Sequence, residues 1–315
     1  MKGWVLEAPG DRSNLVLKDL PVPAIRNEEV LVAVKALSIN PIDIKTRSGK
    51  GLYSVLKNDS PLVLGWDISG VVVDAGNNVN GLKPGDAVFG MVNFPGHGKC
   101  YAEYVAAPAH HLAIKPAQLS HQEAAAASLA ALTAWQAIHS YMPLQKKQRV
   151  LIHAAAGGVG HFAVQIAKSL GAWVAGTASS TNRDFVLGIG ADKHIDYTTA
   201  PLKEQVSDID FVFDAIGGKT IDDSLDVMNK GGTIVSIPSG LNENVAEKAL
   251  EKGMQGYRFL VKSSGSDMNA LANLLAKGII RSHISHRFQF EDIAAAHAQI
   301  ETGRTRGKVI VDVAQ

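Results

Sequence analysis

Residues 149–160, with the sequence RVLIHAAAGGVG, constrain the fold of this chain more than any other feature. A short apolar run leads into a glycine-rich turn, and residues 161–170 then place apolar side chains on one helical face before Gly171 ends the helix. Residues 172–178 predict a second strand. Such a βαβ unit directs backbone N–H groups and the positive end of a helix to one point, which suits a pyrophosphate.

The turn departs from the dinucleotide fingerprint G-x-G-x-x-G at its first position, which is Ala155 instead of glycine. The strand–turn–helix–strand context still favours a dinucleotide site over the alternative, a flavodoxin-like or other α/β turn that is rich in glycine. The residues predicted to contact the cofactor here are Ala156, Gly157, Gly158 and Val159.

The end of the second strand indicates which dinucleotide binds. Proteins that bind NAD place an Asp or Glu there to hold the ribose 2′-hydroxyl, whereas this chain has no carboxylate before Asp184. Ser179 and Ser180 can donate hydrogen bonds to a 2′-phosphate, and Arg183 can pair with it. An alternative function for residues 179–182 is to cap the next helix, and both functions can hold together. We therefore expect NADPH rather than NADH.

Composition excludes several classes of function. A length of 315 residues indicates two domains, and 46% hydrophobic with 19% charged residues is typical of a globular protein. The net charge of +1 and the absence of a basic stripe argue against a nucleic-acid partner. Cys100 is the single cysteine, so no disulfide forms within the chain, and no apolar run predicts a signal peptide or a membrane span. We expect a cytoplasmic protein.

The pattern of elements divides the chain. Short strands separated by turns fill the first third and predict a compact β-domain. Residues 121–128 and 132–139 are helical, and strands then alternate with helices, which predicts a doubly wound parallel sheet. The strands expected in that sheet are residues 150–154, 173–177, 194–197, 211–215, 232–238 and 256–261. Residues 268–277 predict a further helix, and residues 279–290 and 308–313 return to strands that we expect to complete the first domain. The predicted domains are residues 1–121, 122–262 and 263–315.

Several motifs occur together in one order along nearly the whole chain. They are NPIDIKTRSG at 40–49, LGWDISGVV at 64–72, GDAVFG at 85–90, YAEYV at 101–105, AALTA at 130–134, AAAGGVG at 154–160, DAIGG at 214–218 and RGKVI at 306–310. In this the chain resembles the zinc-independent quinone oxidoreductases of the medium-chain dehydrogenase/reductase superfamily and their alkenal and enone reductase relatives. The resemblance implies an α/β fold, with a GroES-like β-barrel domain, a Rossmann domain and the nicotinamide between them.

The chain lacks the residues that bind catalytic zinc in the alcohol dehydrogenases of that superfamily. Trp66 stands where a histidine ligand is expected after Gly65, no cysteine lies near Asn40, and Cys100 has no second cysteine beside it. We therefore expect no metal. Without a Lewis acid, reduction of an electron-poor acceptor is favoured over alcohol oxidation.

Two residues are predicted to be catalytic from their positions in the family pattern. Asn40 lies where relatives have polar groups beside the nicotinamide, although Asn40 and Pro41 also read as a simple turn. Tyr53 matches a tyrosine that lines the cleft, where its hydroxyl could bond a carbonyl oxygen, although a half-buried loop tyrosine is the alternative. Asp43 and Arg47 are expected to form a structural pair or cap, and Asp67 is expected to be structural.

Further cofactor contacts follow from the resemblance and from the rule that ligands lie at the carboxyl ends of parallel strands. The residues are Thr133, Tyr197, Ile216, Gly217, Ser236, Pro238 and Arg304, with Arg306 as the rival of Arg304. A helix back-bond is the alternative for Thr133. His153 and His161 have no visible Ser or Asp partner and are expected to be structural.

The expected activity is NADPH-dependent transfer of hydride to a quinone or an α,β-unsaturated carbonyl. The alternatives are an enoyl thioester reductase and a non-catalytic NADPH-binding protein. Residues 256–261 can form an edge strand that pairs across a homodimer.

Overall fold

The computed structural model describes residues 1–142, 144–238 and 240–313. The chain divides into two compact units: Met1–Leu132 together with Lys262–Gln315 forms the first, and Thr133–Val261 forms the second. Two segments that are far apart in the sequence therefore build one unit.

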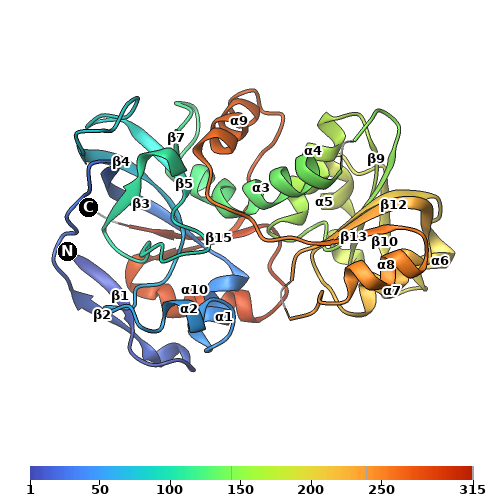
Figure 1. Ribbon diagram of the computed structural model, residues 1–315, viewed down its shortest axis with the longest axis horizontal. Helices are drawn as coiled ribbons and strands as arrows, with labels where there is room; N and C mark the ends of the chain where they lie inside the picture. Colours follow the sequence, from blue (N-terminus) through green and yellow to red (C-terminus); the bar gives the residue numbers. More distant parts are fainter. Residues whose placement is uncertain (143, 239, 314–315) are drawn as a thin grey trace. The chain divides into compact units, whose positions relative to one another are not determined.

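A parallel sheet forms the centre of the second unit (Figure 1). Its strands are β8 (Arg149–Ile152), β9 (Trp173–Ala178), β10 (Lys193–Asp196), β11 (Ile209–Asp214), β12 (Met228–Ser236) and β13 (Gln255–Arg258). Every pairing in it is parallel, and the spatial order is β10-β9-β8-β11-β12-β13. In chain order this is 3-2-1-4-5-6, the doubly wound arrangement of dinucleotide-binding domains, so the predicted sheet is confirmed.

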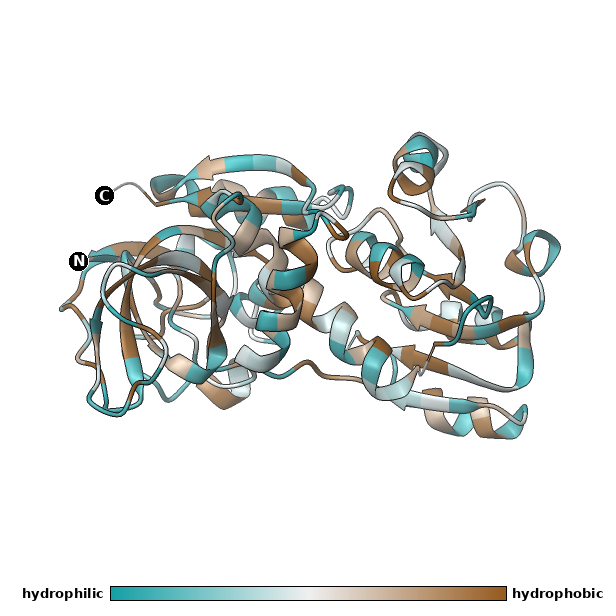
Figure 2. Ribbon diagram, turned by 90° about the horizontal axis from the view of Figure 1, so that it is seen from above, coloured by the Kyte–Doolittle hydropathy of each residue, from teal (hydrophilic) through white to brown (hydrophobic). Residues whose placement is uncertain are grey.

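Helices cover this sheet because each βαβ connection must bring the chain back to the end of the sheet where the parallel strands begin. The helices α4 (Gly160–Ser169) and α5 (Arg183–Gly188) contact β8, β9 and β10, whereas α7 (Lys219–Leu225) and α8 (Val245–Glu251) contact β11, β12 and β13. A shorter helix, α6 (Leu202–Gln205), contacts α7. The strands contribute to one apolar core through Leu151, Ala175, Ile195, Val212 and Ile234. Hydrophilic and hydrophobic residues alternate along the helices in Figure 2, as expected for helices with one buried face.

The first unit contains a mostly antiparallel sheet. Its strands are β3 (Glu29–Ile39), β4 (Asp67–Ala75), β5 (Ala87–Met91), β6 (Tyr104–Pro108), β7 (Leu112–Ile114), β14 (Ile284–Gln289) and β15 (Lys308–Asp312), and a separate pair is formed by β1 (Lys2–Leu6) and β2 (Leu15–Asp19). The helices are α1 (Pro41–Arg47), α2 (Tyr53–Leu56), α9 (Gly265–Ala276) and α10 (Ile293–Glu301). This is the GroES-like β-domain that the sequence predicts in addition to the parallel sheet.

The C-terminal strand β15 joins this sheet by antiparallel pairing with β3, with Val309 opposite Ile39 and Asp312 opposite Ala36. Strand β14 pairs with β15 in parallel. The chain therefore returns to the first unit after leaving the second. None of the helices in the described residues is long and apolar enough to cross a membrane.

Some predicted boundaries differ from the structure. The two helical segments expected around residues 121–139 form one helix, α3 (His121–Tyr141). Helix α9 begins at Gly265 because the Ser264 side chain accepts a hydrogen bond from the Asp267 N–H, a cap that the apolar pattern does not reveal. The strand expected over residues 279–290 begins only at Ile284. The isolated apolar pair at residues 279–280 extended that prediction too far towards the N-terminus.

Candidate functional site: the nucleotide turn and a buried polar cluster

The turn between β8 and α4 is built from close backbone approaches. Ala154 adopts a positive φ of 50°, and its carbonyl accepts a hydrogen bond of 2.8 Å from the Gly157 N–H. A Cβ on Gly160 would lie 2.1 Å from the same carbonyl oxygen, so only glycine fits there. The glycine that the fingerprint predicts at 160 therefore has a structural reason, and a Cβ on Gly157 would lie 3.1 Å from the same oxygen, a tight contact.

Four backbone N–H groups at this turn are left without an acceptor. The N–H groups of Ala156, Gly158, Val159 and Gly160 donate to no atom of the residues that the structure describes. Helix α4 begins at Gly160, and no side chain caps its N-terminus. Unsatisfied N–H groups at a helix N-terminus form an anion site, and they suit the pyrophosphate of a dinucleotide. The residues present at the turn therefore fit this cofactor.

Ser179, Ser180 and Arg183 lie together directly after β9. The Ser179 hydroxyl bonds the Thr181 hydroxyl at 3.0 Å and accepts from the Asn182 side-chain amide at 3.0 Å. Ser179 stands at the N-cap position of the turn that precedes α5, where its carbonyl accepts from the Asn182 N–H at 2.9 Å. The exposed Arg183 guanidinium has no partner within the described part of the chain. The Ser179 hydroxyl therefore caps no backbone N–H of this turn, and the Arg183 side chain is available to an anion.

A carboxylate also lies near this strand end. Asp196 of β10 is opposite Ala178 of β9, and its pKa is held below the usual value by hydrogen bonds, first from the Thr198 side chain and then from the Thr198 N–H. The following residue, Tyr197, is 66% exposed, so its ring is accessible to a ligand. Sequence reasoning noted the absence of an acid after β9 but missed this one, because it comes from the neighbouring strand.

Asp214, at the end of β11, organises the loop beside the turn. Its carboxylate accepts hydrogen bonds from the N–H groups of Ile216 and Gly217 at 3.0 Å and from the Ser236 hydroxyl at 2.6 Å. Ser236 is therefore committed to Asp214, whereas Ile216 is 45% exposed. Pro238 follows in the same loop and is half-buried. The structure brings Ile216, Gly217 and Ser236 together through a carboxylate to which sequence reasoning assigned no role.

His153 corrects one sequence expectation, because it does contact a serine. Its Nε2 lies 2.8 Å from the Ser224 hydroxyl and its Nδ1 lies 3.2 Å from the Thr177 hydroxyl. Ser224 donates its own proton to the Thr220 carbonyl, so Nε2 must carry the proton that Ser224 accepts. A serine nucleophile must instead donate its proton to the histidine, and Ser224 is also fully buried. His153 is structural, as expected, although for a different reason.

In the first unit, Asn40 is buried in a polar cluster. Its amide donates to Asp67 at 2.8 Å and to the Ser38 carbonyl at 3.3 Å, and its oxygen accepts from the Lys308 ammonium at 2.5 Å. Its own N–H donates to Asp43 at 2.6 Å, which begins helix α1 with a capping box. Asn40 is 1% exposed, so every group of its carboxamide is already bonded within the unit.

The cluster holds two carboxyl groups and one ammonium in the protein interior. Burial raises the pKa of Asp43 to about 7 and that of Asp67 to about 6, while the Lys308 ammonium acts in the opposite direction on both. Burial also lowers the pKa of Lys308. Asp43 caps α1 as expected, but Arg47 pairs with Glu301 and with the Gly10 carbonyl instead of with Asp43.

Tyr53 begins the short helix α2 and is half-buried. Its hydroxyl has no hydrogen-bond partner in the part of the chain that the structure describes. A phenol hydroxyl in this state can donate to a carbonyl oxygen of a ligand. Among the two residues predicted to be catalytic, Tyr53 is therefore the one with a free polar group.

The remaining predicted residues differ in their surroundings. Thr133 is 2% exposed, and Arg304 is exposed with no partner for its guanidinium within the described residues. Its rival Arg306 does have an interaction. Trp66 is fully buried and donates to the Gly96 carbonyl at 2.7 Å. Burial raises the pKa of the Cys100 thiol well above its usual value.

Two protein families and many individual proteins are similar to this chain. The alcohol dehydrogenase GroES-like domain family matches residues 26–117, and the zinc-binding dehydrogenase family matches residues 189–311. The quinone oxidoreductase of Coxiella burnetii has a similar structure, with a TM-score of 0.95 and 38% identity over 100% of this chain and 99% of that one.

Curated relatives are similar over nearly the same length. NAD(P)H oxidoreductase RTN4IP1, mitochondrial, of Mus musculus is 34% identical, covering 99% of this chain and 89% of the relative. NADPH-dependent alkenal/one oxidoreductase, chloroplastic, of Arabidopsis thaliana is 32% identical, covering 99% of this chain and 79% of the relative.

Proposed function

Since this chain belongs to the quinone oxidoreductases of the medium-chain dehydrogenase/reductase superfamily, we propose that it transfers hydride from NADPH to a quinone or an α,β-unsaturated carbonyl. The observation that carries the proposal is the set of unsatisfied N–H groups at residues 156 and 158–160, at the point where the strand order of the sheet reverses. In sheets of this kind, dinucleotides bind at that point.

The cofactor preference rests on Arg183 and on the relatives. A 2′-phosphate carries negative charge that the free Arg183 guanidinium can pair with, and Ser180 lies in the same turn. The plant relative is named for its dependence on NADPH. The second unit also contributes the proposed contacts Tyr197, Ile216, Gly217, Ser236 and Pro238.

Two further contacts are proposed, Thr133 in the second unit and Arg304 in the first. Arg304 is favoured over Arg306 because its guanidinium has no partner among the described residues, whereas Arg306 has one. Both guanidinium groups are cationic at neutral pH, so only the availability of the side chain separates them.

The acceptor is reduced at an electron-poor atom. When bound, NADPH supplies a hydride from C4 of its nicotinamide. An enone takes that hydride at its β-carbon, and the resulting enolate oxygen accepts a hydrogen bond from the Tyr53 hydroxyl. Water then protonates the α-carbon. Positioning and exclusion of water carry most of the catalysis in this scheme.

Asn40 is proposed to act at the same site by positioning. Its carboxamide is bonded to Asp67, Ser38 and Lys308, so a direct contact with the acceptor requires one of these bonds to exchange. Its backbone N–H fixes the start of α1 through Asp43. Substitution of Asn40 should therefore lower stability as well as activity.

We also propose zinc independence, a homodimer and a cytoplasmic location. Trp66 replaces a zinc ligand, and no group of three potential ligands forms among the described residues. Strand β13 is at an edge of the sheet, which leaves one side open to a second copy. Activity that survives 1,10-phenanthroline would support zinc independence. A dimeric mass by light scattering would support the homodimer, and subcellular fractionation of the native protein tests the location.

The test of function is NADPH oxidation with 1,4-benzoquinone, 9,10-phenanthrenequinone, a short 2-alkenal and crotonyl-coenzyme A, each repeated with NADH. Turnover of quinones or of the alkenal supports the proposal and selects the acceptor. Faster turnover of the thioester shows an enoyl thioester reductase instead. Tight NADPH binding without any turnover contradicts the proposed enzyme and favours a non-catalytic protein.

A further inference from the structure

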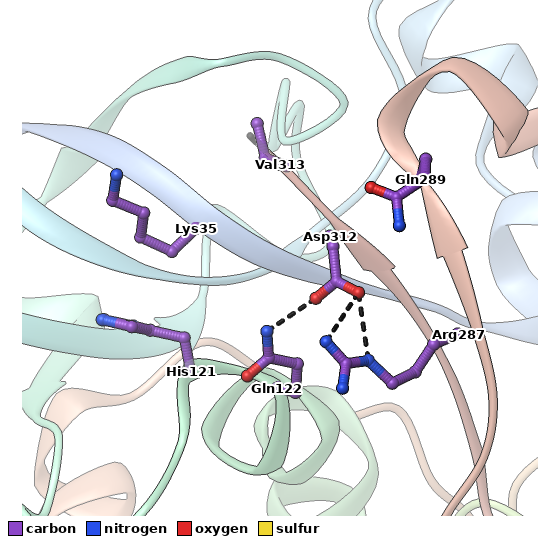
Figure 3. A pocket seen from close by; sticks show the side chains of 7 residues that line it. All are labelled: Lys35, His121, Gln122, Arg287, Gln289, Asp312 and Val313. Carbon is purple, nitrogen blue, oxygen red and sulfur yellow. Dashed lines mark hydrogen bonds and ion pairs between the residues drawn. The ribbon is translucent and has the colours of Figure 1, made fainter. Parts of the chain in front are cut away.

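A pocket of about 500 Å³ opens in the first unit, and none of its lining residues belongs to the proposed nucleotide or acceptor site. Figure 3 shows that it is lined by β3, the first turn of α3, β14 and the end of β15. The lining side chains are Lys35, His121, Gln122, Arg287, Gln289, Asp312 and Val313.

Asp312 has its carboxylate held in place on the wall of this pocket (Figure 3). One oxygen accepts from the Gln122 amide at 2.6 Å, and the other accepts from Arg287, through Nε at 3.0 Å and Nη2 at 2.9 Å. The carboxylate is therefore neutralised by a guanidinium and has a fixed orientation. It retains lone pairs that can accept a further hydrogen bond.

His121 presents a hydrogen-bond acceptor as well. The Ser69 hydroxyl donates its proton to the Val88 carbonyl at 2.9 Å, so the contact of 2.8 Å between Ser69 and His121 requires Nδ1 of His121 to carry the proton. Burial, helped by the ammonium groups of Lys115 and Lys35, lowers the pKa of His121 to about 4. The ring is neutral at physiological pH, and Nε2 is left as a lone pair with no partner among the described residues.

Lys35 gives the pocket its net positive charge. Its ammonium has no hydrogen bond or ion pair to any described residue, and the charges of Arg287 and Asp312 cancel. The Gln289 amide also has no partner within that part of the chain. The pocket thus combines one unpaired cation with fixed acceptors.

We propose that this pocket binds a small oxyanion that carries its own hydroxyl, with hydrogen phosphate as the defining example. The ammonium of Lys35 pairs with the charged oxygens, and the hydroxyl of the anion donates to His121 Nε2. A fully deprotonated oxyanion such as sulfate meets that acceptor with lone pairs only, so the pocket discriminates against it.

The experiment is calorimetric titration with inorganic phosphate and, separately, with sulfate at pH 7.5 in a buffer free of other oxyanions. Saturating NADP⁺ is present in one series, so that phosphate cannot report on the nucleotide site. The variants are Lys35→Gln and His121→Phe, and Lys83→Gln is the matched control because Lys83 is an exposed lysine of the same unit. Thermal unfolding of each variant identifies any that fail to fold.

We expect the wild-type chain and the Lys83→Gln variant to bind phosphate saturably and roughly five- to tenfold more tightly than sulfate, which is the ratio that one hydrogen bond supplies. Lys35→Gln should lose most of the binding of both anions, and His121→Phe should bring the two affinities close together. Saturable binding that is unchanged in Lys35→Gln, equal affinities in the wild type, or no binding would each overturn the proposal.

A second measurement does not depend on any variant. Nitrogen chemical shifts of the wild-type imidazoles report which ring nitrogen carries the proton. We expect His121 to be protonated on Nδ1, and its Nε2 resonance to move upfield when phosphate is added but not when sulfate is added. A proton on Nε2, or an Nε2 resonance that phosphate leaves unmoved, would contradict the proposed contact.

Discussion

Ala155 and Gly176 share one small space between the nucleotide turn and strand β9. A Cβ built on Gly176 would lie 2.7 Å from the Cβ of Ala155 and 2.9 Å from Val186. The methyl group of Ala155, which departs from the glycine fingerprint, therefore fits because the residue beside it has no side chain. The turn keeps its shape because the Ala155 methyl group occupies the space that a side chain at position 176 would need.

Gly176→Ala should therefore distort the turn. Overpacking at a buried site costs on the order of 1–3 kcal/mol, and NADPH affinity should fall with it because the N–H groups of the turn move. Gly188→Ala is the matched control, since a Cβ there meets nothing within 4 Å. Chemical unfolding and NADPH titration measure both variants. Equal stability and affinity in the two variants would show that Ala155 does not need the space.

Arg183→Ala should weaken NADPH binding far more than NADH binding. The guanidinium has no partner among the described residues, so its removal costs only the contact with the 2′-phosphate, about 1.5–3 kcal/mol or roughly 10- to 150-fold in affinity. Lys203→Ala, an exposed cation of the same unit, is the control and should leave both affinities unchanged. An equal loss for the two cofactors in Arg183→Ala would remove the argument for 2′-phosphate recognition.

Tyr53→Phe should lower kcat for an enone with little change in stability. The hydroxyl has no partner in the described chain, so the folded state loses no hydrogen bond, whereas the enolate loses a donor worth about 1–3 kcal/mol of transition-state free energy. Tyr104→Phe, another half-buried tyrosine of the first unit, serves as the control. Steady-state kinetics that are the same in both variants would remove Tyr53 from the mechanism.

Asp43→Asn should change how stability depends on pH. The folded pKa of Asp43 is raised from 3.8 to about 7, so between these values the folded state binds more protons than the unfolded state. The contribution of Asp43 to the free energy of unfolding is therefore largest below about pH 4 and is lost as pH rises through about 7, at roughly 1.4 kcal/mol per pKa unit. In the variant, a carboxamide oxygen replaces the carboxyl oxygen that accepts from the Asn40 N–H, so this hydrogen bond is retained.

The measurement for this variant is the difference in unfolding free energy between wild type and Asp43→Asn at several pH values, because histidines with lowered pKa values affect both proteins equally. The wild type should lose stability relative to the variant from pH 4 to pH 7. Asp19→Asn, at an exposed position in β2, should show no such trend. A constant difference across this range would contradict the raised pKa.

The parallel sheet and its turn were predictable from the sequence because their signals are local. Apolar runs alternate with amphipathic helices, and glycines stand where the backbone approaches itself, as at Gly160. The partner of Ala155 was not predictable in this way. Gly176 belongs to the next strand along the chain, and nothing in that strand marks it as the space for a methyl group.

In the candidate site, too, a local motif predicts some features, whereas others depend on contacts between residues far apart in the sequence. The positions of Ala156, Gly158 and Val159 follow from a motif, whereas the bonds that occupy Asn40 depend on Asp67 and on Lys308 from the other end of the chain. Sequence spacing carries no information about such contacts, because they form only when β15 pairs with β3. The role of Asp214 was not predicted for a similar reason, since its hydrogen bonds to Ile216 and Ser236 form only in the folded loop.

The central claim is hydride transfer, and isotope tracing tests it most directly. NADPH carrying deuterium at C4, prepared separately on each face of the ring, is oxidised by the protein in the presence of a short enone. We predict that deuterium from one face is found at the β-carbon of the saturated product. Oxidation of NADPH with no label in the product, or no oxidation with any acceptor, would contradict the account.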